Sequence, residues 1–191
     1  MKLIFASSNK NKFLEIEKLI PKKIKLGNLQ ELNFYDEIPE NENTIEENAA
    51  FKAKFICSNF NVNVFADDTG LEVQSLKGRP GVHSARYAGS ECNTEKNITK
   101  LLNELKNNKN RKARFKTIIA LILNNKFYQF EGIINGEILS SKKGNKGFGY
   151  DPIFKPDGYD KSFAELSIEI KNKISHRAIA INKLIDFINK K

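Results

Sequence analysis

The segment from Val62 to Gly70 constrains the fold of this chain more than any other. Its first part, Val62 to Ala66, is apolar and strongly β-prone, and it therefore predicts a buried strand. We expect this strand to end at Asp67-Asp68-Thr69-Gly70. Two adjacent carboxylates at the end of a buried strand repel each other strongly unless something compensates them. The segment predicts either a carboxylate pair that binds a metal ion and orients water, or a solvated turn that Gly70 closes.

The rest of the chain alternates between strand-length and helix-length segments, and this alternation predicts a mixed α/β fold. Strands are expected over the apolar or β-prone runs Lys2–Ala6, Ile24–Leu29, Ala113–Leu123 and Phe127–Ile134. Helices are expected after the polar turn Ser7–Lys12, from the capping boxes at Thr44 and Ser162, over Thr94 to about Lys106, and over Ser175 to about Asn189. Asn124-Asn125 predicts a hairpin turn, and Gly136 predicts another turn.

Length and composition favour a water-soluble protein. The 191 residues, 40% of them hydrophobic, fit a single domain over 1–191 or two lobes that share one core, and neither a repeat nor a linker divides them. The longest apolar run, Ile118 to Leu123, has six residues, whereas a membrane-spanning helix needs about 20. The start of the chain has too short an apolar stretch for a signal peptide. Cys57 and Cys92 form no metal or disulfide pattern. We therefore expect a cytoplasmic protein with reduced thiols and no membrane partner.

The charges are distributed unevenly. The formal net charge is +9, yet Glu31 to Glu47 contains seven carboxylates and neither Lys nor Arg. A solvated Lys-rich surface explains the excess, and so does an anionic partner such as a nucleotide, a nucleic acid or phosphate. An acidic stretch in a basic protein is compatible with a divalent cation bound there and anions attracted elsewhere.

The polar turn Ser7-Ser8-Asn9-Lys10-Asn11-Lys12 is a candidate phosphate site. It joins a predicted strand to a predicted helix, and the free backbone N–H groups and positive dipole at a helix start favour phosphate. Lys10 and Lys12 add positive charge. The turn lacks the glycine signature of a P-loop, so an ordinary turn with surface lysines is the alternative.

Two later segments carry side chains suited to a purine base. Phe148-Gly149-Tyr150-Asp151 offers aromatic faces for stacking and a carboxylate that accepts hydrogen bonds from base N–H groups; a tight turn that packs two aromatics is the alternative. His176 and Arg177, with Lys171 upstream, can donate to a purine carbonyl oxygen, or they are polar residues in the first turn of a helix. The residue types give the motif Pro80–Gly89 no chemical role.

Together and in this order, the motifs resemble the inosine triphosphate pyrophosphatase family, which removes non-standard purine nucleoside triphosphates. The matching blocks cover almost the whole chain: Ala6–Lys12, Glu47–Ala49 with Lys52, Ala66–Val73, Pro80–Gly89, Gly147–Phe154, Ser162–Leu166 and Ser175–Arg177. The resemblance implies an elongated mixed β-sheet flanked by helices, with two lobes around a central substrate cleft, and a homodimer. It also implies Mg²⁺-dependent hydrolysis of ITP, dITP and XTP to the monophosphate and pyrophosphate.

The resemblance further implies a role for each matching residue. Asp68 would be the catalytic carboxylate and would bind Mg²⁺ together with Asp67 and Glu40. Glu42 is a rival to Glu40, because Glu40-Asn-Glu-Asn43 departs from the Gly-containing pattern of the family. The substrate-binding residues would be Ser7, Ser8, Asn9, Lys10, Asn11, Lys12 and Lys52 at the triphosphate, Thr69 in place of the commoner Ser, Phe148, Gly149, Tyr150 and Asp151 at the base, and Lys171, His176 and Arg177 at its oxygen-bearing edge.

Two other functions fit part of the sequence. The septum-inhibitor type of nucleotide pyrophosphatase shares the general fold and prefers modified pyrimidines, but the segments Phe148–Asp151 and Ser175–Arg177 argue against it. A nucleic-acid-binding module needs clustered Lys and Arg with interleaved aromatics, whereas the lysines here are scattered and Asp67-Asp68 would oppose a polyanion. We therefore expect an enzyme whose partner is a small-molecule nucleoside triphosphate.

Overall fold

The computed structural model describes residues 1–190 and divides the chain into two compact units. The first unit contains Met1–Asp68, Thr117–Gly132 and the C-terminal segment that begins at His176. The second unit contains Thr69–Lys116 and Ile133–Ser175. Strand β3 (Val64–Val73) passes from the first unit into the second between Asp68 and Thr69. Across residues 1–190, the structure holds no helix with the length and apolar character needed to span a membrane.

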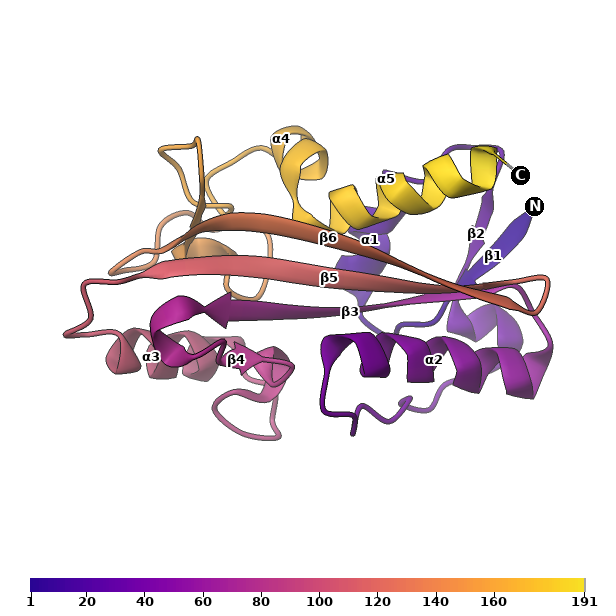
Figure 1. Cartoon of the computed structure of the whole chain (residues 1–191), viewed down its shortest axis with the longest axis horizontal. Helices are drawn as coiled ribbons and strands as arrows, with labels where there is room; N and C mark the ends of the chain where they lie inside the picture. The colour runs from indigo at the N-terminus through magenta and orange to yellow at the C-terminus, as the bar shows by residue number, and fades with distance from the viewer. Residues whose placement is uncertain (191) are drawn as a thin grey trace. The chain divides into compact units, whose positions relative to one another are not determined.

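The strands form one mixed sheet in the order β2-β1-β3-β5-β6-β7, with β4 paired to β3 (Figure 1). Strand β1 pairs in parallel with both β2 and β3. Strand β4 runs antiparallel to β3, and β7 runs antiparallel to β6. The bounds are β1 Lys2–Phe5, β2 Lys25–Gly27, β4 Pro80–Gly81, β5 Lys112–Leu123, β6 Lys126–Ile138 and β7 Phe154–Pro156. The predicted mixed α/β fold is therefore confirmed.

The helices of the first unit are α1 (Lys10–Glu17), α2 (Ile45–Phe60) and α5 (His176–Asn189). Their starts follow from local sequence: the side chain of Asn9 accepts the N–H of Lys12, and the side chain of Thr44 accepts the N–H of Glu47. A short 3₁₀ helix, η1, covers Leu29–Leu32. These caps confirm the helices predicted after Ser7–Lys12 and from Thr44.

The core of the first unit follows the two-residue repeat of β-strands. Leu3, Phe5 and Phe65 belong to one buried cluster with residues of α1 and α5. Because successive side chains in a strand point to opposite faces, Ala66 and Asp68 point away from that cluster. On this second face, Lys52 of helix α2 contacts Asp68. The alternation decides which helix each carboxylate of β3 meets.

The second unit has its own core. It contains α3 (Thr94–Glu104), α4 (Ile168–Ile174) and the 3₁₀ helices η2 (Gln74–Leu76), η3 (Ser84–Arg86) and η4 (Asp151–Ile153). Phe115, Phe154 and Phe163 pack against one another with ring centroids 4.7 to 6.2 Å apart. Both this core and that of the first unit are continuous clusters of buried apolar side chains.

Two turn predictions had different outcomes. The hairpin turn at Asn124-Asn125 is confirmed, and both residues have positive φ angles, 51° and 61°. The turn predicted at Gly136 is wrong, because β6 continues through it to Ile138. Gly136 pairs with Pro156 of β7, and a side chain there would collide with the Lys155 carbonyl oxygen. The glycine permits this close approach of two strands.

Two other local predictions are also wrong. Strand β3 does not end at Asp67 but continues to Val73: Lys12 and Arg177 pair with the buried Asp67, and Leu71 and Glu72 pair with β4. No helix begins at Ser162, although its N–H donates to Glu165 Oε2 at 2.8 Å, as in half of a capping box. Helix α4 begins later, where Ser167 accepts the N–H of Ile170.

Candidate active site

Asp67 and Asp68 lie side by side in β3 and are buried, with 0% and 6% of their surface exposed. This burial excludes the solvated turn that the sequence left open. Because neighbouring strand residues point to opposite faces, the two carboxylates avoid each other and meet different partners. The site in the first unit is therefore built as two half-sites, one on each side of β3.

The Asp67 half-site is closed by two cations. Lys12 of α1 donates to Asp67 Oδ1 at 2.9 Å, and Arg177 Nε of α5 donates to Asp67 Oδ2 at 3.2 Å. Arg177 also donates through Nη1 to the buried carboxylate of Glu15 on α1. Burial opposes the charge of Asp67, but Lys12 and Arg177 outweigh it and hold its pKa well below the usual range. Asp67 is thus a permanent anion that fixes Lys12.

The Asp68 half-site is looser. Lys52 Nζ and Asn48 Nδ2, both on α2, lie 3.4 Å from the two oxygens of Asp68, which is long for a hydrogen bond. Lys52 Nζ lies much closer to Glu40 Oε1, at 2.5 Å. Burial raises the pKa of Asp68, and the negative charges of Glu40 and Asp67 raise it further. Lys52 acts in the opposite direction but does not outweigh them. A buried carboxylate with a raised pKa and weak partners is suited to accept a proton or bind a cation.

The charged side chains of the cluster are paired with one another. Four carboxylates, Glu15, Glu40, Asp67 and Asp68, meet three cations, Lys12, Lys52 and Arg177. Burial alone would lower the pKa of Lys52, but Asp68, Glu40 and Asp67 outweigh burial and raise it, so Lys52 stays charged. Each of these carboxylates is thus paired with at least one cation.

Mg²⁺ fits this cluster at Glu40 and Asp68. Magnesium takes oxygen ligands and is commonly bound through one or two carboxylates plus substrate phosphates. Glu40 and Asp68 converge on the same ammonium group, that of Lys52. Within residues 1–190, no three His, Cys, Asp or Glu side chains are grouped to hold a metal ion alone. Glu42 contributes its backbone N–H to Asn48 Oδ1.

The predicted phosphate turn Ser7–Lys12 includes the first residues of α1, which begins at Lys10. Ser8, Asn9, Lys10 and Asn11 are exposed, and the Ser7 hydroxyl accepts the N–H of Asn9 at 3.3 Å. The N–H of Lys12 is used by the Asn9 cap, at 3.1 Å, while the first N–H groups of a helix have no partner within it. The turn thus combines an accessible helix start with the ammonium group of Lys12, which Asp67 holds.

The predicted base segment lies in the second unit and is organised by one ion pair. Lys171 Nζ lies 2.5 Å from Asp151 Oδ2, and both side chains are 4% exposed. The same Asp151 oxygen accepts the N–H of Phe148 at 2.8 Å. Lys171 Nζ also lies 5.0 Å from the centre of the Phe148 ring, within the range of a cation–π contact. Phe148, Asp151 and Lys171 are therefore brought together as one group, and Phe148 keeps part of its surface exposed.

The other predicted residues have different positions. Arg177 lies in the Asp67 half-site, and His176 is buried beside it at the start of α5. This helix start lies close to Gly132 of β6, where a side chain would collide with the His176 carbonyl oxygen. Tyr150 is buried in the core of the second unit, and Thr69 is partly exposed in β3. Gly149 has a φ of +60°, a conformation that favours glycine.

The sequence analysis gave no role to two residues of the cluster, Glu15 and Asn48, although Asn48 lies in the matching block Glu47–Ala49. Both lie one helical turn from a residue that was found: Glu15 is three positions after Lys12, and Asn48 is four positions before Lys52. Residues at these spacings share one face of a helix. The helical spacing was therefore a usable signal for both residues.

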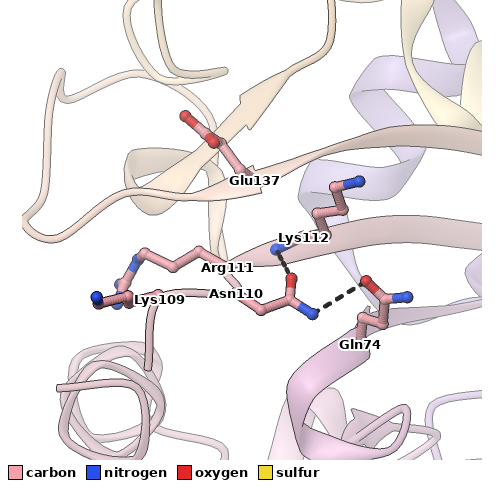
Figure 2. Close-up of a pocket in the computed structure, with 6 residues that line it drawn as sticks. All are labelled: Gln74, Lys109, Asn110, Arg111, Lys112 and Glu137. Atoms are coloured by element: carbon pink, nitrogen blue, oxygen red, sulfur yellow. Dashed lines mark hydrogen bonds between the residues drawn. The ribbon is translucent and has the colours of Figure 1, made fainter. Parts of the chain in front are cut away.

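One surface pocket of the second unit lies elsewhere. Its lining residues are Gln74, Lys109, Asn110, Arg111, Lys112 and Glu137, and none of the predicted site residues is among them. Figure 2 shows the Asn110 side chain bridging this pocket: it accepts the N–H of Lys112 and donates to Gln74. The guanidinium group of Arg111 donates to the carbonyl oxygens of Leu105, Ile138 and Leu139. These contacts hold the connection between α3 and β5 in place.

Fold and site together describe a mixed α/β protein with a buried carboxylate–lysine cluster suited to phosphate and metal chemistry. The model of the Ham1 family matches residues 3–187, and the chain therefore belongs to this family. It is 53% identical over 188 residues to the dITP/XTP pyrophosphatase of Flavobacterium johnsoniae, with 98% of each chain covered. It is 54% identical over 190 residues to the protein of the same name from Christiangramia forsetii, with 100% of each chain covered.

Solved structures agree with this membership. The Ham1 protein of Staphylococcus aureus is 40% identical, with a TM-score of 0.90 and a match that covers 100% of this chain and 99% of that one. The HAM1 protein of Coxiella burnetii is 34% identical, with a TM-score of 0.92 and complete coverage of both chains. These similarities confirm the family that the sequence motifs predicted.

Proposed function

We propose that this protein hydrolyses non-standard purine nucleoside triphosphates, dITP, ITP and XTP, to the monophosphate and pyrophosphate with the help of Mg²⁺. The observation that carries the proposal is the pair of unlike half-sites around Asp67 and Asp68, in a chain of the Ham1 family. One carboxylate is locked by two cations and the other is weakly held. The names of the similar proteins from Flavobacterium johnsoniae and Christiangramia forsetii support the substrate class.

The triphosphate is bound by the turn Ser7–Lys12 and by Lys12 and Lys52. Phosphoryl chemistry depends mainly on positioning and on neutralising charge, and these lysines supply both. When bound at Glu40 and Asp68, Mg²⁺ supplies further neutralisation of the phosphate oxygens. Asp67 and Glu15 act indirectly, because Asp67 fixes Lys12 and Glu15 fixes Arg177.

Asp68 acts on the attacking water. Its raised pKa and its weak contacts with Lys52 and Asn48 suit it to orient the water and accept its proton. The water attacks the α-phosphorus in line, the bond to the bridging oxygen breaks, and pyrophosphate leaves with its charge held by Lys12. The proton from water passes to Asp68 and then to solvent.

Base selection is assigned to the group of Phe148, Asp151 and Lys171. The partly exposed ring of Phe148 stacks on the base, and Lys171 donates a hydrogen bond to the 6-oxo group. Adenine presents an amino group at this position, so a buried donor would lose its partner, which is costly. The position of His176 at the base edge stays a prediction, whereas Arg177 is better explained as the partner of Asp67.

We also propose that residues 1–191 work as one catalytic domain, in the cytoplasm, as a homodimer, with a nucleotide rather than a nucleic acid as partner. Family membership over residues 3–187 supports the first part of this proposal. Sedimentation of the purified protein tests the homodimer: a mass of twice the chain's 21.8 kDa is expected, and a monomer at working concentration contradicts it.

The test of the function is pyrophosphate release from dITP, XTP, ATP, GTP and a 5-methylated pyrimidine triphosphate, each with Mg²⁺ and with excess EDTA. Fast release from dITP and XTP that requires Mg²⁺ is expected. Release from the pyrimidine instead would move the protein to the septum-inhibitor type of activity. No release from any, together with tight salt-sensitive RNA binding, would replace the proposal with the nucleic-acid-binding function.

A further inference from the structure

The motif Pro80–Gly89, to which the residue types gave no role, is anchored to β3 by one serine. Its first two residues form β4, which pairs with Leu71 and Glu72. The hydroxyl of Ser84 accepts the N–H of Leu71 at 2.8 Å and donates to the carbonyl oxygen of Gly81 at 2.6 Å. Ser84 is buried, and so is its hydrogen bond with Leu71. The two hydrogen bonds fix the position of the Ser84 backbone relative to β3.

The residues after Ser84 are held just as closely by α3. The side chain of Asn97 accepts the N–H of Ala88 at 2.6 Å and donates to the carbonyl oxygen of Ala85 at 2.8 Å. Because the chain is tied on both sides of Ser84, its carbonyl group is presented on a rigid base.

That carbonyl group has one side-chain donor, the hydroxyl of Tyr150, at 2.9 Å. Tyr150 is buried in the core of the second unit, and burial raises the pKa of its hydroxyl, which therefore stays a proton donor. Its ring is thus not available to stack on a base. Tyr150 is, however, the residue between Gly149 and Asp151, so its anchor fixes the segment that carries Phe148 and Asp151.

We infer that Ser84 and Tyr150 are positioning residues for base selection: their hydrogen bond holds Phe148 and Asp151 in the arrangement that recognises a 6-oxopurine. This inference rests on the proposed function and explains the Pro80–Gly89 motif. The glycine beside Tyr150 makes the anchor necessary. Gly149 has a positive φ and no atom near the place where a side chain would be, so the segment has little packing of its own there. The hydroxyl of Tyr150 supplies the fixed point.

The test compares two substitutions that each delete one buried tyrosine hydroxyl. Tyr150→Phe removes the donor to Ser84 and keeps the ring in the core. Tyr87→Phe is the matched control, because it removes a hydroxyl from the same unit that bonds to Glu104 of α3 instead. Ser84→Ala is a second variant, which releases the Ser84 backbone from Leu71 and Gly81. Thermal unfolding of each variant establishes that it is folded.

We expect Tyr150→Phe to raise KM for dITP about tenfold, the effect of one lost buried hydrogen bond, and to change kcat less than threefold. In the same variant, the preference for dITP over dATP falls. Calorimetry shows weaker binding of inosine monophosphate but unchanged binding of pyrophosphate. Ser84→Ala shifts the preference in the same direction, and Tyr87→Phe leaves it unchanged.

Two results separate the possible failures. If the unaltered protein releases no pyrophosphate from dITP, the proposed function is refuted. Suppose that the unaltered protein is active and that both tyrosine variants keep its preference for dITP over dATP. The positioning role of Ser84 and Tyr150 is then refuted. Equal losses of preference in both tyrosine variants would also refute it, because they would indicate a general loosening of the unit.

Discussion

The two half-sites predict unequal losses of stability when each carboxylate charge is removed. Asp67→Asn removes the anion that pairs with Lys12 and Arg177, in a position with no exposed surface. Asp68→Asn removes a charge that burial already disfavours and that Lys52 and Asn48 contact only at 3.4 Å. Two neighbouring residues of one strand thus act as controls for each other.

The expected magnitudes differ by several kcal/mol. Removing one partner of a buried ion pair costs about 3–5 kcal/mol, because the other charge stays buried without compensation. A chain of this length loses about 2–4 °C of Tm for each kcal/mol, so Asp67→Asn is expected to lower Tm by about 6–20 °C. For Asp68→Asn we expect a change within about 1 kcal/mol in either direction, since the lost attraction of Lys52 and the relief from burial oppose each other.

The assay is thermal and urea unfolding, followed by circular dichroism in EDTA so that bound metal does not contribute. Asp186→Asn, which changes an exposed aspartate of α5, is the control and is expected to change Tm by less than about 2 °C. Equal losses of stability in Asp67→Asn and Asp68→Asn would refute the division into a locked and a loose half-site. A larger loss in Asp68→Asn would reverse it.

Three further predictions concern the metal, the buried arginine and the base. Glu40→Gln should raise the Mg²⁺ concentration needed for half-maximal pyrophosphate release about tenfold, whereas Glu42→Gln should not change it. If a Mg²⁺ titration shows the increase in Glu42→Gln and not in Glu40→Gln, the metal is assigned to Glu42. Arg177→Ala should lower the unfolding free energy by about 3–5 kcal/mol in urea titrations, because it leaves Asp67 and Glu15 without their shared partner, and a loss below about 1 kcal/mol would contradict that role. Asp151→Asn should reduce kcat/KM for dITP about 10- to 100-fold relative to dATP, because Lys171 and the Phe148 N–H lose a charged acceptor. If steady-state kinetics show the same ratio of kcat/KM for dITP to that for dATP, Asp151 has no part in base selection.

Local features of the fold were predictable from the sequence because their causes lie within a few residues. The caps at Asn9 and Thr44 and the Asn124-Asn125 turn depend on neighbouring backbone groups, and the structure has them where the sequence indicated. The continuation of β3 through Asp67 was not predictable in this way. It depends on Arg177, which is 110 positions away in the chain, and on Lys12.

For the candidate site, the sequence indicated residues of the charged cluster but not their arrangement. The turn Ser7–Lys12 and the Asp67-Asp68 pair pointed to Lys12 and Asp68, and the family resemblance added Lys52. The sequence treated Phe148 and Tyr150 as equivalent aromatics, whereas the structure buries Tyr150 and leaves Phe148 partly exposed. Which of two similar residues faces the core is decided by packing with distant segments, such as the Ser84 turn.

The central claim, that Asp68 carries the hydrolysis of the triphosphate, is tested most directly by single-turnover pyrophosphate release from dITP with Asp68→Asn. Calorimetry of pyrophosphate binding should accompany the kinetics, so that chemistry is separated from binding. We predict that the rate falls about 10²- to 10⁴-fold, as for the loss of a general base, while the variant stays folded and still binds pyrophosphate. A folded Asp68→Asn variant whose rate stays within tenfold of the unaltered protein would contradict the claim.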